Sequence, residues 1–190
     1  EDDAATSLDL LQGASDPDAS DILSVADYTV QSGNAAGLTL NGNQLDIDPS
    51  AYNALAVGES EVVSVSYNVV DGNGGSVAQT ATITITGEND GPTVAAALSL
   101  TASEDDATTS LDLLQGASDP DASDILSVAD YAVQSGDPAG LTLNGNQLDI
   151  NPSAYNYLAV GESEIIVVNY NVIDSNGGSV SQTATITITG

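Results

Sequence analysis

The stretch QTATITITG, residues 79–87, alternates threonine with alanine or isoleucine from one position to the next. A period of two turns one set of side chains toward a protein core and the other toward water, which predicts a β-strand with one buried face. The same nine residues recur at 182–190. The stretch therefore indicates both an all-β protein and an internal repeat.

The repeat extends over almost the whole chain. Residues 1–87 align without a gap with residues 104–190, at a constant offset of 103, and 13 of the 87 pairs differ. A unit of about 100 residues suits an independently folding domain, whereas solenoid repeats are about 20–50 residues long. The segment between the copies carries the glycine and proline expected at a boundary. We predict domains at 1–87 and 93–190, joined by a calcium-binding linker at 88–92.

Seven strands are predicted in the second domain. They follow the runs with period two and the hairpin signal NGN. Their ranges are 94–102, 107–114, 125–134, 140–144, 147–151, 164–173 and 180–189. The first domain lacks the first strand in this chain, which we expect to be a piece of a longer protein. Seven short strands in about 100 residues, in an antiparallel arrangement, are typical of an immunoglobulin-like β-sandwich. The only helix-like piece is residues 49–60, for which a single turn is expected.

The composition excludes several kinds of chemistry. The 190 residues include 28 acidic side chains and no lysine, arginine, histidine or cysteine, for a formal charge of -28. Salt bridges between side chains, disulfides, thiol chemistry and histidine-based catalytic or zinc sites are therefore excluded. Such one-sided charge argues against nucleic acid as a partner. No apolar run approaches the ~20 residues of a membrane span, so direct membrane insertion is not expected.

Clustered carboxylates need a cation that the chain itself does not supply. Two like charges about 4 Å apart repel by about 4 kcal/mol at an effective dielectric constant of ~20. The octapeptide ASDPDASD, at 14–21 and 117–124, packs three aspartates into six residues. Aspartates are also common in turns because they cap their own backbone, and that interpretation suffices for single acids such as Asp9 or Asp46. The octapeptide is not an EF-hand loop, because Asp21 stands where that loop needs glycine.

The acidic clusters fall at the ends of the predicted sandwiches. If the strands alternate in direction, the end of the first domain, the linker and the loops at 119–124 and 174–178 converge on one junction. Calcium takes about 6–8 oxygen ligands at roughly 2.3–2.6 Å in flexible geometry, which suits this donor set. The candidate ligands at the junction are Glu1, Asp2, Asp3, Glu88, Asn89, Asp90, Asp119, Asp121, Asp124 and Asp174. Those at the two outer ends are Asp16, Asp18, Asp71, Glu104, Asp105 and Asp106.

Several motifs also resemble a known family. SEDDA (103–107), ASDPDASD, LAVGESE (55–61), YNVVDGNGGS (67–76) and TITGENDGPTV (84–94) are similar to the VCBS-type, cadherin-like repeats of bacterial surface proteins. More narrowly, the chain resembles an extender module of large RTX-type adhesins. The resemblance implies a Ca²⁺-binding β-sandwich, repeated between an outer-membrane anchor and a distal adhesive tip, outside the cell and in settings such as biofilms.

The resemblance to cadherins also implies ligand roles. By position, the ligands of a cadherin junction correspond to Glu1, Asn89 and Asp90, Asp119 and Asp121, and Asp174. The linker departs from the cadherin pattern, because END stands in place of the longer DxNDN. Without calcium we expect the chain to hinge at Gly91 and Pro92.

Three classes of function remain to be compared. The first is a structural spacer, monomeric, whose partners are calcium and neighbouring repeats of the same chain. The second is a module that binds carbohydrate or another cell, against which the absence of tryptophan and phenylalanine for sugar stacking argues. The third is an enzyme, which we do not expect. Asp16 and Asp18 could imitate the carboxylate pair of a glycosidase, but they have no cationic or imidazole partner.

Overall fold

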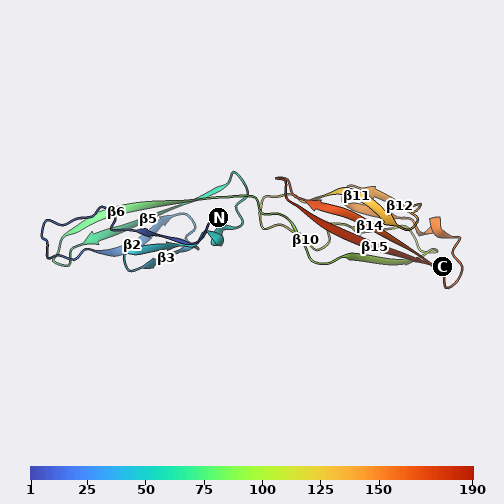
Figure 1. Ribbon diagram of the computed structural model, residues 1–190, viewed down its shortest axis with the longest axis horizontal. Coiled ribbons are helices and arrows are strands. Elements are labelled where there is room, and N and C mark those ends of the chain that lie inside the picture. The colour runs from blue at the N-terminus through green and yellow to red at the C-terminus, as the bar shows by residue number, and fades with distance from the viewer. The chain divides into compact units, whose positions relative to one another are not determined.

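The alternating stretch forms the end of strand β6 (Ser76–Thr86), where Ile83 and Ile85 are buried and Thr82, Thr84 and Thr86 are exposed. A computed structural model describes residues 1–190 and contains strands, turns and two short 3₁₀ helices, with no α-helix. The chain forms two compact units, Glu1–Glu88 and Asn89–Gly190 (Figure 1). Each has its own core between two main sheets, so the prediction of two tandem all-β sandwich domains is confirmed.

Unit 1 consists of two three-stranded sheets. One has the order β1-β4-β3 and the other β2-β5-β6, and every pairing is antiparallel. The bounds are β1 Thr6–Asp9, β2 Ser24–Ser32, β3 Leu38–Asn41, β4 Gln44–Ile47 and β5 Ser60–Val70, together with β6. The NGN signal forms a two-residue turn between β3 and β4, in which Gly42 has a φ of +62°. This positive φ suits glycine at a hairpin turn.

Unit 2 repeats this plan with additional strands. Its sheets have the orders β12-β13-β9, β11-β14-β15-β8 and β10-β7. The bounds are β7 Thr93–Val94, β8 Leu98–Ser103, β9 Thr109–Asp112, β10 Ala117–Ser118, β11 Ser127–Ser135, β12 Leu141–Asn144, β13 Gln147–Ile150, β14 Ser163–Ile173 and β15 Ser179–Thr189. Its core centres on side chains with no exposed surface, such as Leu148, Tyr155 and Ile166.

The strand expected at 94–102 is divided into β7 and β8, which belong to different sheets. The interruption falls at the alanines 95–97. There Ala95 donates its N–H to Gly116, and the carbonyl of Ala96 accepts a hydrogen bond from the Gln182 side chain at 2.7 Å. These contacts satisfy backbone groups that leave one ladder before joining the other. The prediction of one continuous strand was therefore wrong.

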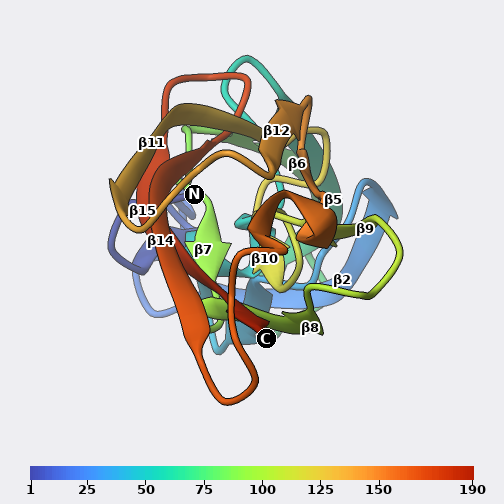
Figure 2. The same ribbon diagram turned by 90° about the vertical axis from the view of Figure 1, so that its right-hand side faces the viewer.

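Strand β8 also corrects the prediction of a purely antiparallel sandwich. It runs parallel to β15, from Leu98 opposite Ala184 to Ser103 opposite Thr189. In Figure 2 the end of β15, near the C-terminus, meets β8. Both strands run toward the same end of the unit, so their edge pairing is parallel. Strand β8 covers the edge of β15, and Ile186 and Ile188 have no exposed surface. Ile83 and Ile85 of β6, which has no such neighbour, are each 7% exposed.

The helix-like piece at 49–60 is a single 3₁₀ turn in each unit, η1 Pro49–Tyr52 and η2 Pro152–Tyr155. Tyr52 is buried, and its hydroxyl donates to the carbonyl of Asn34 at 2.7 Å. Tyr155 makes the equivalent bond to Asp137 at 2.8 Å. Each tyrosine therefore closes one end of its core, with its polar atom satisfied.

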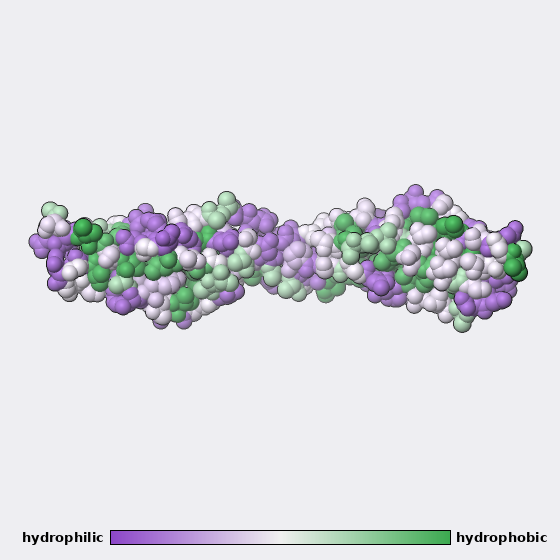
Figure 3. Space-filling model, turned by 90° about the horizontal axis from the view of Figure 1, so that it is seen from below, coloured by the Kyte–Doolittle hydropathy of each residue, from purple (hydrophilic) through white to green (hydrophobic).

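On the face drawn in Figure 3, apolar atoms occur in small groups separated by polar atoms. The most exposed large apolar side chains are single residues in loops, such as Val160, Ile22 and Ile125. The structure contains no helix with the length and apolar character needed to cross a lipid bilayer.

Candidate metal centre

Two loops of unit 2 bring three carboxylates together. Asp119 and Asp124 lie in the loop between β10 and β11, and Asp174 begins the loop between β14 and β15. One oxygen from each lies within 4.8 Å of the others. In unit 1 the equivalent residues Asp16, Asp21 and Asp71 form the same group. Asp21 was not among the predicted ligands, although the offset of 103 pairs it with Asp124.

Short-range sequence explains how the loops are shaped. Asp119 Oδ1 accepts the N–H of Asp121 at 3.0 Å, which is the local turn that aspartate favours. Asp174 Oδ1 accepts three successive N–H groups, from Asn176, Gly177 and Gly178, at 2.8, 2.6 and 2.8 Å. The sequence DSNGG therefore wraps its own backbone around the first residue. Gly177 has a φ of +113°, a conformation that only glycine adopts readily.

The residues that open unit 2 contact both loops. Asp90 donates its N–H to Asp121 Oδ2 at 3.0 Å, and Asn89 donates its side-chain amide to Asp174 Oδ2 at 3.2 Å. The predicted grouping of Asn89 and Asp90 with Asp121 and Asp174 is thus present within this unit.

Burial distinguishes the two copies of the octapeptide. Asp121 is 1% exposed, whereas Asp18, at the same place in the identical sequence of unit 1, is an exposed residue. Asp174 is 5% exposed, while its equivalent Asp71 is half-buried. Nothing in unit 1 takes the place of Asn89 and Asp90, so the difference follows from the segment that packs over the loops of unit 2.

The buried carboxylates of unit 2 are only half satisfied. At this end of the unit, five buried side-chain oxygens make no hydrogen bond: Asn89 Oδ1, Asp90 Oδ2, Asp119 Oδ2, Asp121 Oδ1 and Asp124 Oδ2. A buried unsatisfied polar group costs about 1–3 kcal/mol, and a charged one more. Five such oxygens, four from carboxylates and one from an amide, fit the hard oxygen donor set that Ca²⁺ takes, and the chain has no cationic side chain to pair with them.

The charges also act on one another. Burial raises the pKa of Asp119 and of Asp121, and neighbouring carboxylates, Asp90 and Asp124 among them, raise both pKa values further. Burial acts in the same direction on Asp174, but the hydrogen bonds from Asn89 and from three backbone N–H groups outweigh it and lower its pKa. Asp174 is therefore held as an anion by the protein, whereas Asp119 and Asp121 lack a positive partner.

Unit 1 has its own buried acid at its first residue. Glu1 is 6% exposed, its Oε1 accepts the N–H of Glu88 at 2.6 Å, and its Oε2 is buried without a partner. Glu104, its equivalent in unit 2, also has a buried and unpaired Oε2.

The remaining predicted ligands lie outside these buried groups. The side chains of Asp2, Asp3, Glu88, Asp105 and Asp106 are exposed. Asp106 Oδ2 accepts the N–H of Ser103 at 2.8 Å, which gives it a role in the turn. Asp16 and Asp71 belong to the unit 1 group of three, and Asp18 does not.

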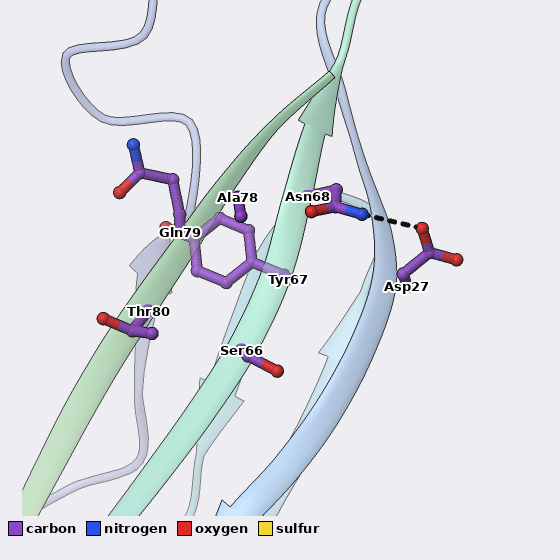
Figure 4. A pocket seen from close by; sticks show the side chains of 7 residues that line it. All are labelled: Asp27, Ser66, Tyr67, Asn68, Ala78, Gln79 and Thr80. Atoms are coloured by element: carbon purple, nitrogen blue, oxygen red, sulfur yellow. Dashed lines mark hydrogen bonds between the residues drawn. The ribbon is translucent and has the colours of Figure 1, made fainter.

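Each unit also has a shallow groove of about 350 Å³, beside the hairpin β5–β6 in unit 1 and β14–β15 in unit 2. In unit 1 the groove lies beside Asp27, whose Oδ2 accepts the amide of Asn68 at 2.8 Å (Figure 4). Asp27 has a φ of +54° at the irregularity in the β2–β5 register. Asp130 and Asn171 repeat the pair in unit 2. In each groove the single carboxylate of the lining is already paired with the neighbouring asparagine and gives no indication of a ligand.

Comparison with known proteins points to one family. The family described as the cadherin-like domain matches residues 1–86 and 88–189. Among solved structures, the chain is similar to human mucin-like protocadherin EC1-2, with 15% identity, a TM-score of 0.49, and coverage of 85% of this chain and 83% of that one. Protocadherin gamma B2 extracellular cadherin domains 1-5 shows 14% identity, a TM-score of 0.44, and coverage of 87% of this chain and 33% of that one. Mouse cadherin-23 EC22-24 shows 12% identity, a TM-score of 0.44, and coverage of 87% and 52%. This chain thus spans about a third of the length of the protocadherin gamma B2 chain and about half of the length of the cadherin-23 chain. No curated protein matches it significantly.

Proposed function

Because the chain belongs to the cadherin-like domain family, we propose that its two units are calcium-rigidified extender repeats of a bacterial cell-surface adhesin. Domains of this family are extracellular, adhesion-type modules, typically structural rather than enzymatic, and they generally bind Ca²⁺. In the proposed role the repeats project a distal adhesive region away from the cell. Their partners are calcium ions and neighbouring repeats of the same chain.

The observation that carries the proposal is the set of five buried, unpaired oxygens at the start of unit 2. Four of them come from carboxylates or an amide whose other polar atom is engaged by the protein: Asn89, Asp119, Asp121 and Asp124. One atom fixes each side chain and leaves the other available. This arrangement suits cation binding, because ligands fixed in advance lose little entropy when the ion binds.

The residues have distinct roles in this proposal. Asp119, Asp121, Asp124 and Asp174 would hold Ca²⁺ from the loops of unit 2, and Asn89 and Asp90 from the linker. Glu1 would join them by the resemblance to cadherin junctions; within unit 1 its Oε1 accepts the N–H of Glu88 and its Oε2 is buried without a partner. The ion supplies the positive charge that this sequence lacks. We further propose domain limits at 1–87 and 93–190, with the linker at 88–92.

The placement on a bacterial surface rests on the sequence resemblance. The motif DGNGG, followed by a Thr/Ile strand and TGEND, is the most specific part of the similarity to VCBS-type repeats of RTX adhesins. Export from the cell would take such a chain into surroundings rich in calcium. Extracellular modules bind this ion at about 10⁻⁴–10⁻³ M.

Calorimetry on the EDTA-treated chain tests the metal site. Titration with Ca²⁺ should give saturable heat, and Mg²⁺ should give much less, because Mg²⁺ demands near-octahedral geometry and dehydrates reluctantly. The double variant Asp119→Asn/Asp121→Asn should lose binding at the start of unit 2. The matched control Asp16→Asn/Asp18→Asn changes the same two positions of the identical octapeptide and should retain that binding. Equal isotherms for the two double variants, or no heat from the wild type, would contradict the proposal.

A further inference from the structure

Gly178 and Gly75 occupy the same position in the two units but meet different neighbours. A Cβ atom added at either glycine would collide with the carboxylate that begins its loop, Asp174 or Asp71. At Gly178 it would also lie 2.8 Å from the Cα of Gly91 and 3.0 Å from the Cδ of Pro92. Backbone and a proline ring cannot move aside as a flexible side chain can. The absence of a side chain at Gly178 therefore makes room for the linker, a role that Gly75 does not have.

Three of the four residues 89–92 are held by the rest of unit 2. Asn89 donates to Asp174, Asp90 donates to Asp121, and Pro92 is buried. The next residue, Thr93, begins β7 and donates its hydroxyl to the carbonyl of Ser118 at 3.1 Å. All of these contacts are made by protein atoms alone. None of them requires a cation.

The chemistry of the linker argues in the same direction. Proline fixes its own φ, so Pro92 limits the motion available to the Gly91–Pro92 dipeptide. The segment that was expected to act as a hinge is thus restricted at Pro92 and packed against Gly178. By contrast, the peptide bond between Glu88 and Asn89 joins a residue held by Glu1 of unit 1 to a residue held by Asp174 of unit 2.

We infer that residues 89–92 are a fixed part of unit 2 with or without calcium, seated on Gly178 and Asp174. The calcium-free chain then flexes at the backbone torsions on either side of the Glu88–Asn89 peptide bond. Gly178 is accordingly a positioning residue: it touches no proposed ion but sets where Asn89 and Asp90 lie. The inference concerns the metal-free state and goes beyond the proposed function. The inference can be wrong although the chain binds calcium, and it can be right although the chain binds none.

Amide hydrogen exchange on the full chain in EDTA tests this inference. The N–H of Asp90 should exchange at least about tenfold more slowly than the N–H of a residue in an open linker, as expected of a hydrogen bond to a charged group. Gly178→Ala should remove this protection, because its new Cβ meets Gly91 and Pro92. The matched variant Gly75→Ala, which meets only Asp71, should leave the Asp90 amide protected. Protection of Val168 and Val172 in β14 reports whether unit 2 remains folded.

A second variant keeps the test valid if Gly178→Ala unfolds unit 2. Asn89→Ala removes the amide that binds Asp174 without adding any atom, and it should accelerate exchange at Asp90 while β14 stays protected. The inference is overturned if the Asp90 amide of the wild type is unprotected in EDTA. It is equally overturned if Asp90 remains protected in a folded Gly178→Ala variant or in Asn89→Ala.

Discussion

Asp121 donates its N–H to Asp119 Oδ1 at 3.0 Å, yet each of these two carboxylates keeps one buried oxygen without a partner. The bond fixes the side chain of Asp119, and the N–H of Asp90 fixes that of Asp121. Burial raises the pKa of both carboxyls, and neighbouring carboxylates raise both pKa values further. The pair is therefore destabilising in the metal-free chain and useful only when a cation is bound. Function and stability are in conflict at this point of unit 2.

The conflict predicts an unusual effect for Asp121→Asn. In EDTA the free energy of unfolding of the variant should be about 1–3 kcal/mol higher than that of the wild type, so the variant should be more stable. The reason is that an amide of the same shape replaces a buried unpaired charge. In calcium the order should reverse, since the variant loses a ligand. Denaturation with urea, with and without calcium, measures both effects.

Asp18→Asn is the control for that experiment. Asp18 is exposed in the identical octapeptide of unit 1, so its substitution should change stability by less than about 0.5 kcal/mol. An Asp121→Asn variant that is less stable than the wild type in EDTA would contradict the account of half-satisfied carboxylates.

Asp174 has the opposite character, because the protein satisfies it as an anion. Asp174→Ala leaves three backbone N–H groups without their acceptor and should cost about 2–4 kcal/mol in EDTA as well as in calcium. Asp71→Ala removes the same kind of acceptor from Asn73, Gly74 and Gly75 at a more exposed site of unit 1. It should cost less and leave calcium binding by unit 2 unchanged. Thermal unfolding followed by circular dichroism, with calorimetric titration, distinguishes the two variants, and equal losses of calcium binding would contradict the assignment.

The side chain of Gln182 predicts a difference between the two sheet edges. Gln182 is 7% exposed and holds the carbonyl of Ala96 where the chain crosses from β7 to β8, whereas the equivalent Gln79 is exposed. Gln182→Ala should lower the stability of unit 2 by about 1–2 kcal/mol and accelerate amide exchange in β8. Gln79→Ala should have almost no effect. Similar effects for the two variants would show that Gln182 does not secure the crossing.

Much of the fold could be predicted because its signals are local. The alternation in β6, the NGN turn and the offset of 103 each follow from nearby or repeated residues. The break at alanines 95–97 could not be predicted in this way, since it depends on a glutamine 86 residues further along the chain. The parallel pairing of β8 with β15 was implicit in the alternating directions of the strands, but the pattern of the segment itself does not reveal which edge it joins.

The candidate site shows the same limit. Asp18 and Asp121 stand in identical octapeptides, so no local pattern predicts that one is exposed and the other 1% exposed. The difference comes from Asn89 and Asp90, which contact the loops of unit 2 and not those of unit 1. Gly178 was not predicted as important, because a pair of glycines is ordinary in a turn and the contact with Gly91 appears only in three dimensions. By contrast, Asp21 was predictable from its pairing with Asp124.

Small-angle X-ray scattering of the full chain, in calcium and in EDTA, tests the central claim most directly. The account predicts a narrow distribution of dimensions in calcium and a broad one in EDTA, because carboxylates of both units and the linker then repel one another without a cation. Asp119→Asn/Asp121→Asn should scatter in calcium like the EDTA sample, and the control Asp16→Asn/Asp18→Asn should scatter like the calcium-bound wild type. If the EDTA sample and the Asp119→Asn/Asp121→Asn variant both scatter like the calcium-bound wild type, calcium does not control the rigidity of this chain and the extender mechanism is wrong.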